Sequence, residues 1–196
     1  GHKVESVETG KKGVVVKVSA DGEEKTLEAE QTLVAVGFRP NTAGLGLETA
    51  GVKMDAKGNI EVNDRMESNV AGIWAIGDVT GKVLLAHVAS TQGILCSDAM
   101  AGKQTTPINY VNIPHATYCQ PQVASFGLSE AAAKAAGKEI KVGSFPFQAN
   151  GKALGLGETT GFVKIISDAK YGEILGAHMI GPEVSELLPE LTLAQS

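Results

Sequence analysis

The segment Gly72-Ile-Trp-Ala-Ile-Gly-Asp78 places a carboxylate where it could bind the hydroxyl groups of a polyol. Residues 73–76 are apolar without polar alternation, which predicts a strand buried on both faces of a mostly parallel sheet. Open α/β sheets bind ligands at the carboxyl ends of such strands, where Gly77 would let a ligand approach the backbone. Taken alone, a Gly-Asp pair is more often a simple turn.

A second candidate binding segment follows shortly after Asp78: Leu84-Leu-Ala-His-Val-Ala-Ser-Thr-Gln-Gly93. Apolar bulk at Val88, Leu95 and Met100, with small residues between them, predicts a helix that packs closely on a sheet. Gly102 is expected to end this helix.

These two segments together resemble the second flavin-binding motif of the pyridine-nucleotide-dependent disulfide reductases, most closely that of the dihydrolipoyl dehydrogenases. The resemblance implies that Asp78 binds the ribityl chain of FAD. It also implies that Leu84, Leu85, Ala86 and His87 run along the isoalloxazine ring.

Composition and charge argue against several classes of function. The net charge of -5 and the lack of clustered Lys or Arg argue against a nucleic-acid partner. No apolar run approaches the roughly 18 residues of a membrane span, and no signal-like segment opens the chain, so we expect a soluble, cytoplasmic protein. Cys96 and Cys119 lack a Cys-x-x-Cys spacing, so no metal site is expected and both thiols are interpreted as buried and inert.

The first third of the chain predicts an antiparallel meander from 4–7, 14–18 and 25–28, because turn residues separate these β-rich runs. A continuously apolar run follows at 32–36, which predicts another buried strand, ending at Gly37 before the break at Pro40. By resemblance, this is the last strand of the family's nicotinamide-binding, Rossmann-like domain, and Gly37 lies against NAD.

The last third predicts an α+β domain. We expect strands near 116–118 and at 139–147, 161–167 and 174–180. A helix is expected from about Ser129, its N-cap, to Ala136, with Gly137 as its stop. A helical tail over 183–194 should kink at Pro189 or begin after a short lead-in turn. His178 is interpreted as a buried histidine satisfied by a hydrogen bond, without a catalytic role.

This last third resembles the family's dimerisation domain through Gly172-Glu-Ile-Leu-Gly-Ala-His-Met-Ile-Gly-Pro182. The resemblance therefore divides the chain into three parts. Residues 1–42 would be the end of the NAD-binding domain, 43–107 the second segment of an FAD-binding domain, and 108–196 a truncated dimerisation domain. A homodimer is implied, and the tail leucines are candidates for its contact: Leu187, Leu188, Leu191 and Leu193.

Several family motifs are absent from these residues: the flavin Gly-x-Gly-x-x-Gly, the redox Cys-x-x-x-x-Cys, the second glycine-rich motif and the catalytic His-Glu pair. We therefore expect an inactive fragment of a larger enzyme, with no catalytic residue in the chain. The resemblance implies that the enzyme oxidises dihydrolipoyl groups with NAD+ through FAD and a redox disulfide. Its partner would be a lipoyl-bearing protein of a 2-oxoacid dehydrogenase or glycine cleavage complex. A noncatalytic dimerisation module and a fragment of mercuric or glutathione reductase remain as alternatives.

Overall fold

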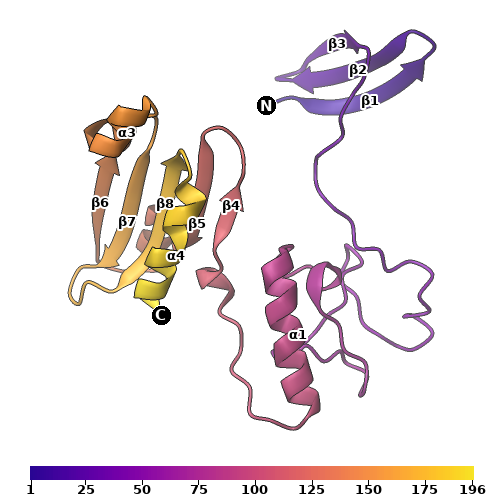
Figure 1. The fold of residues 1–196 in the computed structure, drawn as a ribbon. Coiled ribbons are helices and arrows are strands. Elements are labelled where there is room, and N and C mark those ends of the chain that lie inside the picture. Colours follow the sequence, from indigo (N-terminus) through magenta and orange to yellow (C-terminus); the bar gives the residue numbers. More distant parts are fainter. The chain divides into compact units, whose positions relative to one another are not determined.

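The chain forms two separate antiparallel sheets, shown in Figure 1. A computed structural model describes residues 1–196 and divides them into two units, Gly1–Arg39 and Pro40–Ser196. No helix has the length and apolar character needed to cross a membrane. The mixed α/β class expected from the sequence is confirmed.

The first unit is the predicted meander of β1 (Lys3–Gly10), β2 (Gly13–Ala20) and β3 (Glu23–Ala29). Asp21 and Gly22 connect β2 and β3 and both have positive φ, at 53° and 84°. Two-residue hairpin turns of this hand match the twist of the strands they join, and they favour Asp-Gly. The meander is thus specified locally.

The buried strand predicted over residues 32–36 is wrong. This segment is neither helix nor strand, and the side chains of Leu33 and Val36 are 89% and 91% exposed. A strand of a parallel sheet needs neighbours on which to form hydrogen bonds, and this segment pairs with no strand of the chain. Its apolar composition alone therefore does not produce a strand.

The second prediction of a buried strand, over Ile73 to Ile76, is also wrong. The backbone makes one isolated antiparallel bridge, Glu67 with Trp74, and Ile76 is exposed. The alternating run 59–62, a pattern that predicts a further strand, forms only one bridge, between Met54 and Ile60. Small apolar clusters replace a sheet core here: one around Val52, Ile60 and Ala75, the other around Met66, Leu95 and Cys96.

The predicted helix is confirmed as α1 (Ala86–Met100), the longest element of the chain, but the packing on a sheet is wrong, since α1 packs against the 3₁₀ turn Gly77–Thr80. It ends as predicted at Gly102: the Gly102 amide donates to the Ala99 carbonyl oxygen (3.1 Å), and the Lys103 amide donates to that of Asp98 (3.0 Å). These two bonds are those of a Schellman motif, which satisfies the last carbonyl groups of a helix.

The second sheet belongs to the last third of the chain and has the strand order β4-β5-β8-β7-β6, all antiparallel. Four of its strands are near their predicted positions, while β5 was not predicted. The bounds are β4 His115–Thr117, β5 Gln122–Gly127, β6 Ile140–Pro146, β7 Phe162–Asp168 and β8 Ile174–Gly181.

Three helices accompany this sheet: α2 (Glu130–Ala135), α3 (Gly151–Leu156) and α4 (Val184–Gln195). Helix α4 packs on β5 and β8 (Figure 1) and closes the main core, whose buried residues include Phe126, Met179 and Leu188. Helix α2 has Ser129 as its predicted N-cap, whereas α3 was not predicted. Pro189 lies inside α4, so of the two expectations the lead-in turn is wrong, while the kink stays a prediction.

Candidate functional site

The turn that carries Asp78 is a short 3₁₀ helix, Gly77–Thr80, docked against α1. Gly77 has a φ of 75°, a conformation that favours glycine, and a Cβ there would lie 3.4 Å from the Ala89 Cβ atom. The Thr80 hydroxyl group donates to the Gly77 carbonyl oxygen at 2.8 Å. The backbone angle therefore favours glycine at this position, and a Cβ there would be in van der Waals contact with α1.

The Asp78 side chain is exposed, and its carboxylate takes part in no salt bridge or hydrogen bond within the chain. Only its backbone carbonyl group is used, as the acceptor for the Gly81 amide at 3.0 Å. A carboxylate offers two oxygen atoms that only accept. Asp78 is thus free to bind hydroxyl groups of a ligand, which is the role predicted for it.

The beginning of α1 carries the other predicted flavin residues. Leu85 is the N-cap and provides no side-chain hydrogen bond, and no acidic residue lies in the first turn. The first amide groups of a helix lack acceptors within the helix, and its N-terminus has a partial positive charge. Leu84, Ala86 and His87 are exposed beside these amides, while Leu85 is half-buried. This helix start could therefore stabilise negative charge on a ligand.

His87 connects the start of α1 to the strand-rich part of the unit. Its Nε2 atom lies 3.1 Å from the Pro114 carbonyl oxygen, which can only accept, so this nitrogen must carry the proton. A cavity of about 510 Å³ lies between the start of α1, β4 and α4, and His87, His115 and Glu186 contribute to its wall. The structure thus brings Leu85, Ala86 and His87 together at one cavity.

A buried glutamine links the Asp78 turn to α1. Gln92 is fully buried, its Oε1 atom accepts from the Gly77 amide at 2.6 Å, and its Nε2 atom donates to the Tyr110 hydroxyl oxygen at 3.0 Å. The Lys82 Nζ atom lies 5.3 Å from the centre of the Tyr110 ring. None of Gln92, Tyr110 and Lys82 was predicted as a site residue. The signal of Gln92, one polar residue on the small and apolar side of a helix, is weak.

Gly37 is not part of this arrangement. It lies in the other unit, on the exposed segment after β3, and no atom lies within 4 Å of the place a Cβ would take. The role assigned to Gly37 stays a prediction.

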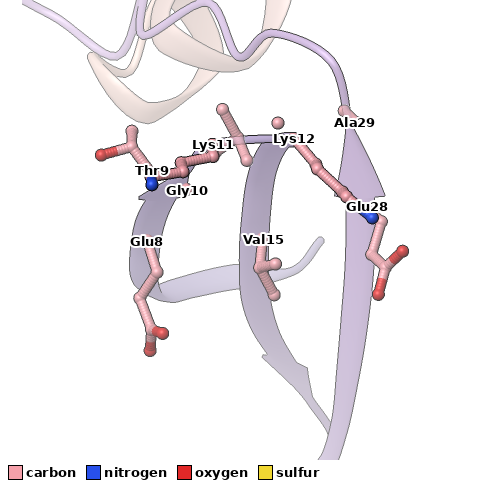
Figure 2. Close-up of a pocket in the computed structure, with 10 residues that line it drawn as sticks. Glu8, Thr9, Gly10, Lys11, Lys12, Val15, Glu28 and Ala29 are labelled. Atoms are coloured by element: carbon pink, nitrogen blue, oxygen red, sulfur yellow. The ribbon is translucent and has the colours of Figure 1, made fainter.

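A cavity of about 560 Å³ lies at the β1–β2 turn of the first unit, as Figure 2 shows. Lys11 and Lys12 form the turn, and Glu8 and Glu28 belong to the flanking strands. One of these charges is already used, since Glu8 pairs with Lys17 at 3.5 Å. None of the predicted ligand-binding residues lines this cavity, so its size does not make it the functional site.

The remaining candidate groups have structural explanations. Cys96 is buried, which raises the pKa of its thiol, as expected for an inert residue. The same interpretation was wrong for Cys119, which is exposed. His178 was predicted to be a buried histidine satisfied by a hydrogen bond. The hydrogen bond is confirmed, since its Nε2 atom lies 3.1 Å from the Leu128 carbonyl oxygen, although the side chain is only half-buried. No cluster of His, Cys, Asp and Glu could hold a metal ion.

Two family models match the chain. One, described as pyridine nucleotide-disulphide oxidoreductase, matches residues 1–93, and the other, the dimerisation domain of the same proteins, matches residues 113–196.

Curated relatives are similar over the whole chain. The dihydrolipoyl dehydrogenase of Mycobacterium leprae is 53% identical over 196 residues, which is 100% of this chain and 42% of that protein. The dihydrolipoyl dehydrogenase of Corynebacterium glutamicum is 50% identical over 201 residues, covering 100% of this chain and 43% of that protein. The chain thus spans less than half the length of these relatives.

Two solved structures are similar to the chain. LpdA from Mycobacterium tuberculosis has a TM-score of 0.90 at 29% identity, with 99% of this chain and 42% of that chain covered. The HOCl-induced flavoprotein disulfide reductase RclA from Escherichia coli has a TM-score of 0.87 at 26% identity, with 98% of this chain and 44% of that chain covered.

Proposed function

Because the chain belongs to the pyridine nucleotide-disulphide oxidoreductases, we propose that it supplies part of the flavin site and of the dimer contact of a dihydrolipoyl dehydrogenase. Such an enzyme would oxidise a dihydrolipoyl dithiol to the disulfide and reduce NAD+ to NADH, with release of one proton. The names of the relatives support this activity over that of mercuric or glutathione reductase. A lipoyl-bearing protein of a multienzyme complex in the cytoplasm would be the partner.

The proposal rests on the free carboxylate of Asp78, which lies on a turn docked against α1, the helix whose start is uncapped. A ribityl chain presents hydroxyl donors, which match a carboxylate that has no partner in the protein. An isoalloxazine ring gains negative charge on reduction, which matches a helix N-terminus. The residues present therefore fit FAD.

When bound, FAD would supply the two-electron chemistry that couples dithiol oxidation to NAD+ reduction. The contribution of this chain is placement. Asp78 would hold the ribityl chain, and Leu84 to His87 would line the ring and keep water away from it. Gly37 would lie against NAD, as the family resemblance implies.

We propose in addition that the enzyme is a homodimer that associates through residues 113–196, because this segment matches the dimerisation domain. Of the four tail leucines, Leu188 is buried in the core and Leu191 packs against it, whereas Leu187 and Leu193 are 39% and 76% exposed. Leu193 is the most exposed of the four and therefore the best candidate for a contact between copies. Sedimentation velocity checks this proposal: a species of one-chain mass over a hundredfold range of concentration would contradict it.

The flavin role is tested by Asp78→Ala in the intact flavoenzyme that carries this chain. Removing a charged acceptor costs about 1.5–3 kcal/mol, so FAD affinity should fall about tenfold or more. The matched control is Asp64→Ala, since Asp64 is also exposed and unpaired. Equal FAD retention on dialysis by the wild type and the Asp78→Ala variant would refute the proposed role.

A further inference from the structure

Gln92 is a buried polar side chain that the flavin proposal does not use. Its exposed fraction is 0%, and it is the only charged or amide side chain among the buried residues. A buried amide is stable only when its donor and acceptor are both paired, and here each of them is.

The acceptor bond holds the Asp78 turn. The Gly77 amide, which donates to Gln92 Oε1 at 2.6 Å, directly precedes Asp78 in the chain. Because Gln92 and the predicted ring-lining residues 84–87 belong to the same helix or its lead-in, this bond fixes the turn relative to the start of α1. The two halves of the proposed flavin site are thereby joined by one side chain.

The donor bond pairs the NH₂ group of the Gln92 amide. Tyr110 lies in the segment between α1 and β4, and its hydroxyl oxygen accepts from Gln92 Nε2 at 3.0 Å. If the amide group rotated by half a turn, an NH₂ group would face the Gly77 amide, and two donors would meet. The Gly77 amide, which can only donate, therefore keeps Oε1 directed at it, while the Tyr110 hydroxyl group, which can donate or accept, accepts from Nε2.

We propose that Gln92 is a positioning residue for flavin binding, which acts by holding Asp78 at a fixed place relative to the start of α1. This inference rests on the proposed function, because it assigns a role to Asp78 in binding FAD. It adds a residue that does not itself contact the cofactor. Tyr110 is its supporting partner.

The test uses FAD affinity of the intact flavoenzyme in a double-mutant cycle of Gln92→Leu with Asp78→Ala. Gln92→Leu alone should weaken FAD binding about tenfold, since the turn loses its only side-chain acceptor. In the Asp78→Ala background the same change should have less than about a threefold effect, because residues that act through one another are not additive. Gln92→Glu, whose carboxyl group still accepts from the Gly77 amide, should restore most of the affinity.

The matched control is Gln104→Leu at an exposed position just beyond α1, which should leave FAD affinity unchanged. If Gln92→Leu does not fold, Tyr110→Phe replaces it, and a loss of about threefold or more is then expected because Nε2 is left unpaired. Unchanged affinity in a folded Gln92→Leu or Tyr110→Phe protein, or an equal loss in both Asp78 backgrounds, would overturn the inference. Should Asp78→Ala itself have no effect, the proposed flavin role is what fails.

Discussion

The two parts of the second unit obtain their stability in different ways. Residues from His115 onward form a five-stranded antiparallel sheet with one continuous core, closed by α4. Residues 40–100 have no strand, and two small clusters and one long helix hold them. Antiparallel strands find partners through short hairpins, whereas the strands of a parallel sheet depend on residues far along the chain. The residues proposed to bind flavin, Asp78 and Leu84 to His87, lie in the part that has no sheet.

The largest effect is expected for Phe126→Ala in the sheet core. Phe126 is 1% exposed, and truncation of such a side chain costs about 3–5 kcal/mol. Amide exchange should accelerate in β5, β8 and α4, while the amides of residues 60–75 keep their rates. The control is Phe145→Ala, because Phe145 is 51% exposed in β6. Uniform acceleration over both parts would show that they unfold together and would remove the contrast.

A smaller effect is expected for Met66→Ala. Met66 is 1% exposed but packs in a cluster with only two other buried residues, Leu95 and Cys96. The free energy of unfolding should therefore fall by about 2 kcal/mol, the low end for such truncations. Amide exchange should accelerate in α1 and not in the sheet. Met100→Ala, at an exposed position of the same helix, is the control. A loss as large as that of Phe126→Ala would contradict the distinction between a continuous core and small clusters.

The smallest expected effect is a dependence of folding stability on pH, caused by Glu130 in the part that contains the five-stranded sheet. Hydrogen bonds from Lys134 and then Lys164 lower the pKa of Glu130 to about 2, from an ordinary 4.5. Since the folded pKa is the lower one, Glu130 stabilises the fold above pH 4.5, and this contribution is lost as the pH falls toward 2.

The melting temperature of the wild type should accordingly fall more between pH 5 and pH 2 than that of Glu130→Gln, which lacks this titration. Glu158→Gln removes an exposed carboxylate that has no ion pair, so this variant should follow the wild type. Parallel curves for the wild type and Glu130→Gln would show that the two lysines do not stabilise the folded state.

The sequence predicted elements whose signals are local. The Ser129 cap, the stops at Gly102 and Gly137, and the strands β6 to β8 were placed close to where they lie. The family resemblance drawn from the motifs is confirmed by the matches to both domain models and by the relatives. The domain boundaries and the site residues stay predictions.

Elements with weak local signals were missed. In β5 the inward positions include Ala124, whose small side chain hides the alternation with Phe126. Helix α3 contains Gly151 and Gly155, which have low helix propensity, and its beginning is fixed by the Asn150 side chain, which accepts from the Ala153 amide at 3.0 Å. Gln92 was missed because hydrophobic periodicity gives no information about which buried amide a backbone turn requires.

The exposed run from Thr32 to Phe38 has a consequence for handling the chain. A short, uncharged, β-branched segment without proline can pair with copies of itself in a cross-β arrangement, and here it is accessible in the folded state. Charged residues and proline next to such a run act as gatekeepers against aggregation. Glu30 precedes this run and Arg39-Pro40 follows it. These three residues therefore protect the chain's solubility where its apolar surface is most open.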